Sequence, residues 1–308
     1  MQPLVSVVIS AYNSAPYLGT SIGSVLGQTW QNLECIVVDD GSTDSTKETV
    51  LRISDLRLHY HYKSNQGTVA AARNFGVSIA NGQFIAFLDA DDAWIPRKLE
   101  VQMKLFQIRP ELGFVYCAYA ITDFNLNPLT VVIPERRSDL FIGTILSERN
   151  GIAAGSTTVY RRSVFDRCVG FRTELSVSED TEFASRAADI FQADGVDECL
   201  VLYRSHPSQG HKGLDAFEHD SYWILRDRFG DDTRSSYLLR RGLANVHTRL
   251  FYYKLYRGQL SALNHLFLAL KCGPNRFFLL PLEAFRRKIQ RRRVSAKFRS
   301  NWHGGMLA

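Results

Sequence analysis

The chain has 308 residues, of which 45% are hydrophobic and 12% aromatic. This composition excludes a disordered protein and suffices for one large α/β domain with a smaller appendage. Eight of the 37 Lys and Arg lie between Arg286 and Arg299, so residues 1–285 carry a slight excess of acids. A nucleic-acid-binding body is therefore not expected.

The cysteines and the apolar runs indicate a cellular compartment. Five scattered cysteines contain no CxxC pair, which argues against a disulfide framework or a structural zinc site and predicts a cytoplasmic protein. The sequence enters a strand-like run directly, without a basic and apolar leader, so no signal peptide is expected. No uninterrupted apolar run reaches the roughly 18 residues of a membrane span.

The first third of the chain alternates strands and helices. Apolar runs at 5–9 and 34–39 predict buried strands, and helical spacing between them, with Ser14 as N-cap and Pro16 in the first turn, predicts a βαβ unit. Further strands are expected at 58–62, 83–88 and 113–119, and helices at 67–80 and 97–108. The pattern predicts a doubly wound α/β sheet flanked by helices, with ligands beyond the carboxyl ends of its strands.

The C-terminal third is helical. Apolar residues recur at helical spacing over 239–251 and 260–270, with Gly258 between the two runs. This predicts a helical hairpin within 215–285 that packs on the α/β domain.

Residues 286–308 form a basic tail in which apolar residues such as Phe298 and Trp302 are interspersed with Lys and Arg. One interpretation is an interfacial segment on the anionic inner face of a membrane, which would make the protein peripheral there. The other is a solvated basic terminus whose apolar residues pack on the hairpin.

Acids stand at the ends of two predicted strands. Asp39 and Asp40 end the second strand, and Asp89 and Asp91 follow the fourth. An acid at a buried strand end lowers stability unless a ligand or metal pairs with its charge. Mg²⁺ or Mn²⁺ often bridges such carboxylates to phosphates. A solvated acidic turn or a helix cap is the alternative.

Six ordered motifs carry a family resemblance. They are VSVVISAYN at 5–13, SVLGQT at 24–29, VVDDGSTD at 37–44, NQG at 65–67, ARN at 72–74 and FLDADD at 87–92. In this order and spacing they resemble the opening of family-2 glycosyltransferases. The resemblance implies a GT-A fold over residues 1–214, with a nucleotide-binding half at 1–120 and an acceptor-binding half at 121–214.

The resemblance also implies a nucleotide site. Its residues would be Ser10, Tyr12, Asp39, Asp40, Arg73, Asp89 and Ala90. Tyr12 would stack on uracil, Asp40 would accept a hydrogen bond from the base with Asp39 beside it, and Arg73 would approach the diphosphate or ribose. Alternatively, Tyr12 belongs to the core and Arg73 to a surface ion pair, and Asp44 is expected to cap a helix.

The same resemblance implies a divalent cation, Mg²⁺ or Mn²⁺. Asp91 would be its main ligand, and Asp89 would bind the metal or the ribose. Two histidines follow the strand expected at 200–203, at a point where some relatives contact the metal or diphosphate. His206 is the first candidate for such a contact and His211 the second, with solvated loop histidines as the alternative.

A carboxylate that takes a proton from the acceptor is expected in SEDTEF at 178–183. This segment resembles the family's Glu-Asp stretch, which implies Asp180 as the base and Glu179 as an orienting or acceptor-binding neighbour. A capped helix with Ser178 as N-cap is the local alternative.

The implied activity is inverting transfer of a sugar from a nucleotide-sugar donor to a hydroxyl of a glycan or lipid-linked acceptor in bacterial cell-surface polysaccharide synthesis. The expected donor is a UDP-sugar. The alternative is a catalytically inactive module that binds a nucleotide-sugar or a glycan. A dehydrogenase would need GxGxxG after its first strand, and a nucleotidyltransferase a Gly-rich basic loop, and the segment at 10–13 is neither. The sequence also lacks the Gln-x-x-Arg-Trp motif of processive synthases.

Overall fold

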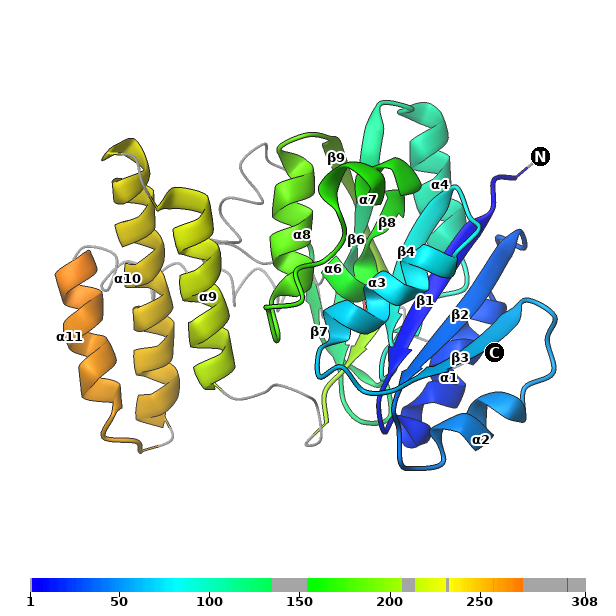
Figure 1. The fold of residues 1–308 in the computed structure, drawn as a ribbon, viewed down its shortest axis with the longest axis horizontal. Coiled ribbons are helices and arrows are strands. Elements are labelled where there is room, and N and C mark those ends of the chain that lie inside the picture. The colour runs from blue at the N-terminus through cyan, green and yellow to red at the C-terminus, as the bar shows by residue number, and fades with distance from the viewer. Residues whose placement is uncertain are drawn as a thin grey trace.

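The computed structural model describes residues 2–134, 154–206, 214–230, 233–256 and 258–273, together with Phe298. Figure 1 shows an α/β domain beside a set of helices, α9 to α11, that follows it in the chain. The first half of the α/β domain comprises β1 (Val5–Ala11), α1 (Ala15–Leu26), β2 (Leu33–Asp40), α2 (Thr46–Leu51), β3 (Leu58–Lys63), α3 (Val69–Ile79) and β4 (Phe84–Asp89).

The second half of the domain contains both the shortest and the longest strands of the sheet. Its elements are β5 (Ala93–Trp94), α4 (Lys98–Ile108), β6 (Leu112–Thr122), β7 (Pro128–Val132), α6 (Ala154–Thr157), β8 (Val159–Arg161), α7 (Arg162–Cys168), α8 (Glu179–Ala188) and β9 (Gln192–Arg204). All the strands belong to one mixed sheet in the order β3-β2-β1-β4-β8-β6-β9-β5, with β7 paired to β6. The predicted α/β sheet is thereby confirmed.

Strands β3-β2-β1-β4 are parallel, and β8 then pairs antiparallel with both β4 and β6. Beyond β8, β6 and β9 pair in parallel again. The expected doubly wound pattern therefore holds for the first four strands and breaks at β8. A short strand such as β8 carries too few residues for its direction to be read from periodicity.

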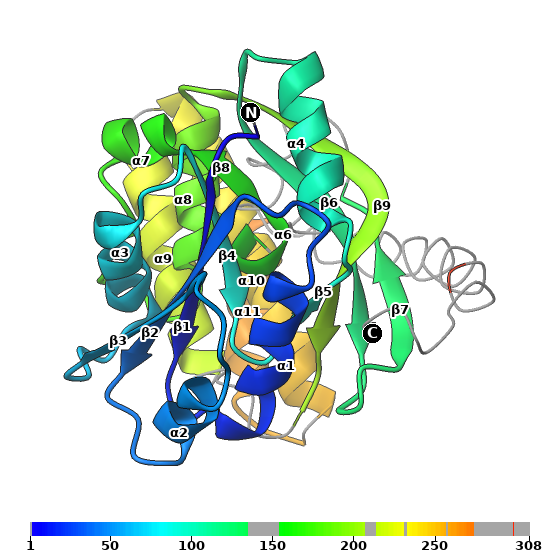
Figure 2. The ribbon, with the colours of Figure 1, turned by 90° about the vertical axis from the view of Figure 1, so that its right-hand side faces the viewer.

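Alternating strand residues build a core on each face of the sheet. Val7 and Ile9 face α1 and α4, where they join one apolar cluster, whereas Val8 faces α3, α7 and α8 in a second cluster. Figure 2 shows these two sets of helices on opposite sides of the strands. Phe298 packs against the first cluster, and the rest of the basic tail lies outside the described residues.

The helical extension consists of α9 (Leu214–Phe229), α10 (Thr233–Tyr256) and α11 (Ala262–Cys272). The predicted pair of helices corresponds to α10 and α11, and α9 is an additional helix. Leu175, from the loop before α8, packs with Ile224, Leu225, Val246 and Leu250, and this contact joins the extension to the α/β domain. No helix among the described residues has the length and hydropathy of a membrane span.

A buried chain of polar side chains links the three helices of the extension. The Tyr222 hydroxyl lies 2.5 Å from Nε2 of His247, whose Nδ1 lies 3.2 Å from Nδ1 of His265. The Lys254 ammonium, which can only donate, lies 2.8 Å from Nε2 of His265. Glu218 completes a His-His-carboxylate group of metal-ligand type with ligand atoms within 4.8 Å of one another, but the Lys254 ammonium already supplies a cation there.

Candidate active site

The expected strand-end residues meet at one edge of the sheet. In the parallel register Ser10 lies opposite Asp89, Ala11 opposite Asp39, and Asp40 opposite Lys63. The carboxyl ends of β1, β2 and β4 therefore present Tyr12, the Asp39–Asp40 pair and Asp89 side by side, as the strand pattern predicted.

The Asp39–Asp40 pair divides into a structural acid and a more accessible one. Asp39 is buried and accepts hydrogen bonds from the Ser42 backbone N–H at 2.8 Å and the Tyr60 hydroxyl at 2.6 Å. Asp40 lies 3.4 Å from the Lys63 ammonium. Burial and the bond to Asp39 raise the pKa of Tyr60, so its hydroxyl remains a donor.

Tyr12 stands at the open side of this edge, with 54% of its surface exposed. The alternative of a core tyrosine is therefore wrong. The loop after Asp40 turns at Gly41, where φ is +82° and a Cβ would lie 2.8 Å from the Asn65 backbone nitrogen, so only glycine fits. As expected, Asp44 is a cap, and its carboxylate accepts the Ala15 N–H at the start of α1.

Ser14 has the predicted place before α1, but its side chain makes no capping hydrogen bond. Asp44 does that work, together with Thr46, whose hydroxyl accepts the Ser14 N–H at 2.9 Å. A cap supplied from another loop leaves no local signature in the helix sequence.

The acidic turn after β4 is anchored through Asp92. Its N–H donates to the Asp89 carbonyl at 3.1 Å, which closes the turn. Its carboxylate is buried and accepts from the Ser156 hydroxyl at 2.6 Å and from the Arg204 N–H at 3.0 Å. The Ala90 carbonyl accepts the Ser21 hydroxyl at 2.7 Å. These bonds fix the backbone from which Asp89 and Asp91 project.

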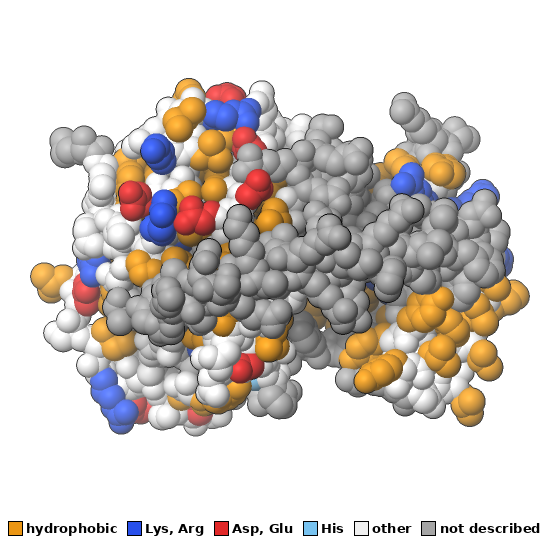
Figure 3. All heavy atoms as spheres, turned by 180° about the vertical axis from the view of Figure 1, so that it is seen from behind, with side chains coloured by type: hydrophobic (Ala, Val, Ile, Leu, Met, Phe, Trp, Pro, Cys, Tyr) orange, Lys and Arg blue, Asp and Glu red, His pale blue; other side chains and the backbone are white. Residues whose placement is uncertain are grey.

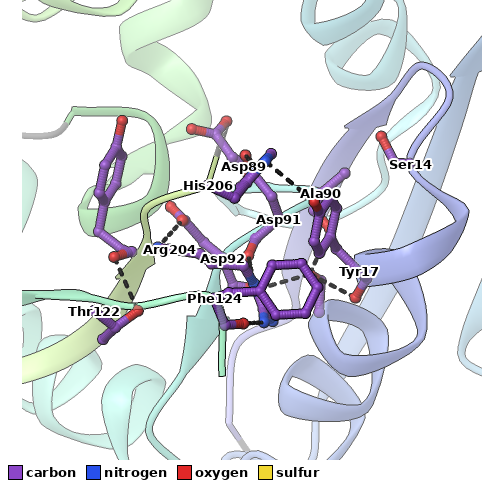
Figure 4. A network of polar contacts seen from close by, with 12 residues as sticks. Ser14, Tyr17, Asp89, Ala90, Asp91, Asp92, Thr122, Phe124, Arg204 and His206 are labelled. Atoms are coloured by element: carbon purple, nitrogen blue, oxygen red, sulfur yellow. Dashed lines mark hydrogen bonds and ion pairs between the residues drawn. The ribbon is translucent and has the colours of Figure 1, made fainter. Parts of the chain in front are cut away.

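Asp91 faces His206, as Figure 4 shows. Its Oδ2 lies 3.0 Å from Nε2 of His206, and Nδ1 of the same ring lies 3.1 Å from the Tyr17 hydroxyl. The Arg204 side chain donates to the Asp91 carbonyl at 2.7 Å and lies over the Tyr17 ring. Sequence reasoning named His206 but missed Tyr17, which contacts its ring, and Arg204, which holds the Asp91 backbone.

These residues suit a divalent cation. Burial and the neighbouring Asp89 raise the pKa of Asp91, while His206 acts in the opposite direction. Two crowded carboxylates and an imidazole are oxygen and nitrogen ligands whose mutual repulsion a bound cation would relieve.

Arg73 joins the two predicted halves of the site. It is buried; one terminal nitrogen lies 2.6 Å from Asp89 and the other 2.6 Å from Glu179. Its guanidinium also lies over the rings of Phe87 and Phe171. The alternative of a surface ion pair is wrong, because this guanidinium sits inside the protein and pairs with an acid on either side.

Asp180 lies next to this ion pair at the start of α8. Its Oδ2 accepts the Gly155 N–H at 2.9 Å and its Oδ1 the Thr181 N–H at 2.6 Å. A Cβ at Gly155 would lie 2.7 Å from the Arg73 guanidinium and 3.3 Å from the Asp89 carboxylate. Asp89 and Asp180, far apart in sequence, thus flank one glycine.

The acids at this point hold their protons more tightly than usual. Burial raises the pKa of Asp180, with a further contribution from Asp89 and an opposing one from Arg73. Burial likewise raises the pKa of Glu179 to about 7, although Arg73 lowers it. Such carboxyl groups are typical of sites that transfer protons.

The loop before α8 is held by the extension, which sequence reasoning did not anticipate. The buried Asp220 carboxylate of α9 accepts the backbone N–H groups of Ser176 and Val177 at 2.8 Å each and of Ser178 at 3.2 Å. Ser178 occupies the N-cap position but forms no side-chain cap. Asp220 therefore positions the chain that leads into Glu179. The second histidine candidate, His211, lies outside the described residues.

Known proteins resemble this chain in sequence and in fold. The family model described as glycosyl transferase family 2 matches residues 6–169, more than half of the chain. The chain belongs to glycosyl transferase family 2. This confirms the sequence resemblance.

One curated relative is the Escherichia coli UDP-Glc:alpha-D-GlcNAc-diphosphoundecaprenol beta-1,3-glucosyltransferase WfgD, which is 39% identical over 133 residues, covering 43% of this chain and 52% of the relative. The first curated relatives are matched over about half to two thirds of their own length.

Solved structures share the fold. The S. aureus TarS 1-349 complex with UDP-GlcNAc has a TM-score of 0.63 at 20% identity, covering 97% of this chain and 92% of that one. The Pyrobaculum calidifontis mannosyltransferase PcManGT, in complex with GDP-Man and Mn²⁺, has a TM-score of 0.57 at 19% identity, covering 98% and 88%. The GT-A fold predicted from the sequence is confirmed.

Proposed function

We propose that this family-2 protein is an inverting glycosyltransferase that moves a sugar from a UDP-sugar to a hydroxyl of a glycan or lipid-linked acceptor in polysaccharide synthesis. One observation carries the proposal: Arg73 pairs with Asp89 on the nucleotide side and with Glu179 beside Asp180. The carboxylates expected to serve donor and acceptor thereby share one region. The names of WfgD and of the TarS complex support a UDP-sugar donor.

The donor would bind at the carboxyl edge of the sheet. Exposed Tyr12 would stack on uracil, and Asp40 would accept a hydrogen bond from the base, while Asp39 holds the loop beneath it. Because Arg73 is already paired with two acids, it would position Asp89 instead of binding the diphosphate directly. Ser10 and Ala90 would line the same edge through their backbone.

Asp91, Asp89 and His206 would hold a divalent cation, Mg²⁺ or Mn²⁺. Such an ion, when bound, offsets the negative charge that the leaving diphosphate gains. Tyr17 would fix the ring of His206 through Nδ1, which leaves Nε2 directed at Asp91. Support comes from the donor set and from the Mn²⁺ named in the PcManGT complex.

Asp180 would be the base. The acceptor oxygen attacks the anomeric carbon as the bond to the UDP oxygen breaks on the opposite face, and the acceptor proton passes to the Asp180 carboxylate. This displacement inverts the anomeric configuration. A raised pKa, caused by burial, makes Asp180 a stronger base than a solvated aspartate. Glu179, fixed by Arg73, would orient the helix start.

Asp180→Asn tests the assignment. Loss of a general base should lower the transfer rate by roughly 10²–10⁴-fold, while calorimetry shows UDP affinity nearly unchanged. Asp166→Asn, on the exposed surface of α7, is the matched control and should transfer normally. Near-normal transfer by Asp180→Asn would remove it as base. UDP-sugar binding by the unmodified protein, with neither transfer nor hydrolysis, would favour the inactive binding module.

A further inference from the structure

Helix α11 presents its large apolar side chains to the outside. Leu263 and Phe267 are 61% and 68% exposed, and Leu270 continues the stripe one turn later. The opposite side of the helix, which packs inward, carries Ala262, His265 and Ala269, and Leu266 is partly buried beside them. An amphipathic helix in a water-exposed protein normally buries its large apolar face, so this helix faces the reverse way.

The end of α10 extends the same surface. Tyr256 is 93% exposed, and Tyr252, Tyr253 and Leu255 are exposed beside it, with Leu260 in the connection to α11. Figure 3 shows apolar side chains gathered over this part of the extension, at the right of the view. We call Tyr256, Leu260, Leu263 and Phe267 with their neighbours on these two helices the hairpin surface. An exposed apolar area of this kind marks an interaction site.

The charge around the hairpin surface has one sign. Residues 233–273 contain seven Lys and Arg and no Asp or Glu, and one of the seven, Lys254, lies buried between the helices. Arg240, Arg249 and Lys271 are exposed on the two helices. By contrast, α9 carries acids as well as bases. A partner that fits this surface must offer an apolar region for the exposed side chains and negative charge for the cations. A layer that is anionic outside and apolar beneath meets both requirements.

We propose that the hairpin surface binds the anionic face of a lipid bilayer. Leucine and phenylalanine would enter the boundary between headgroups and acyl chains, tyrosines would stay at headgroup level, and the cations would meet lipid phosphates. A second copy of the chain suits this surface less well, because pairing two such faces would oppose cation to cation. The inference goes beyond the proposed function, since binding requires no catalysis, and it would place the enzyme at a lipid-linked acceptor.

Vesicle flotation of the full chain tests the proposal. The protein should float with phosphatidylglycerol–phosphatidylcholine vesicles and not with phosphatidylcholine alone. Leu263→Ser with Phe267→Ser should weaken partitioning at least about tenfold, because two apolar anchors are lost. Leu56→Ser with Ile108→Ser, equally exposed apolar residues of the α/β domain, is the matched control and should float normally.

Charge-removing variants and a measurement of oligomeric state test the two remaining alternatives, binding through the tail and self-association. Arg240→Gln with Lys271→Gln should weaken binding by about fivefold per charge, and added salt should do the same. UDP affinity should stay unchanged in every variant, which shows that each is folded. Flotation that is unaffected by both double variants would overturn the proposal and leave the tail as the membrane segment. Light scattering that shows a dimer of the unmodified chain and a monomer of the serine variant, with unchanged flotation, would overturn it in favour of self-association.

Discussion

The α/β domain and the helical extension differ in where they place polar and apolar side chains. In the α/β domain, large apolar side chains fill both faces of the sheet, and the buried acids collect with Arg73 at one edge. In the extension, His247, His265 and Lys254 lie between the helices, while Leu263, Phe267 and other apolar residues face outward. The charged groups of the domain thus gather at the proposed ligand site, whereas the polar groups of the extension hydrogen-bond its helices to one another.

This contrast has an energetic meaning. Crowded carboxylates such as Asp89 and Asp91 repel one another until a ligand or cation arrives. The chain from Tyr222 to Lys254, in contrast, satisfies its donors and acceptors internally. We therefore expect ligands to stabilise the α/β domain strongly and the extension only through Asp220 and Leu175.

The largest expected effect comes from Arg73→Leu. It leaves Asp89 and Glu179 without their partner, and breaking a buried ion pair by removing one member costs about 3–5 kcal/mol of unfolding free energy. Arg109→Leu, which removes an exposed arginine paired with Asp194, is the control and should hardly change the urea midpoint. Equal effects of the two variants would show that the Arg73 pairs are no different from surface ones.

Acidification should open the extension before the domain. Burial and the neighbouring His265 and Lys254 lower the pKa of His247 to about 4. The folded extension therefore excludes a proton that the unfolded chain binds, so this contribution is complete above pH 6.5, the ordinary value, and is lost as pH falls towards 4. The full loss is about 3 kcal/mol at most.

Hydrogen exchange of α9–α11 against β1–β4, measured from neutral to acid pH, checks this expectation. His247→Phe should flatten the acid loss of protection in α10, since it removes the titrating ring. His59→Gln, at an exposed position of β3, should leave the acid loss of protection in α10 unchanged. Protection that declines equally in domain and extension would contradict the contrast between them.

The smallest effect concerns Asp220, where the two regions meet. Asp220→Asn removes the negative charge from the oxygen that accepts three N–H groups, which weakens these bonds. The looser approach to Asp180 should lower the catalytic constant by about tenfold. UDP affinity should stay constant, because the residues proposed to bind the donor lie on the sheet. Asp215→Asn, exposed on the same helix, is the control. Loss of UDP affinity in parallel with rate would indicate general destabilisation instead of positioning.

The sequence predicted what depends on local pattern. Buried strands and their ends are read from short apolar runs, so the α/β sheet and the shared edge of Asp40 and Asp89 could be anticipated. The role of Arg73 could not, because its partner Glu179 is 106 positions away and nothing in ARN distinguishes a buried bridge from a phosphate contact. Asp220 was missed for the same reason, since its partners are backbone groups of a distant loop.

The Arg73 bridge has a consequence for how such enzymes diversify. A single guanidinium that holds Asp89 and Glu179 couples changes in the proposed donor and acceptor sites. Substituting position 89 or 179 alone would leave Arg73 with one acidic partner instead of two. We expect the residues at 73, 89 and 179 to be retained together across relatives, so that differences in sugar specificity arise in the surrounding loops.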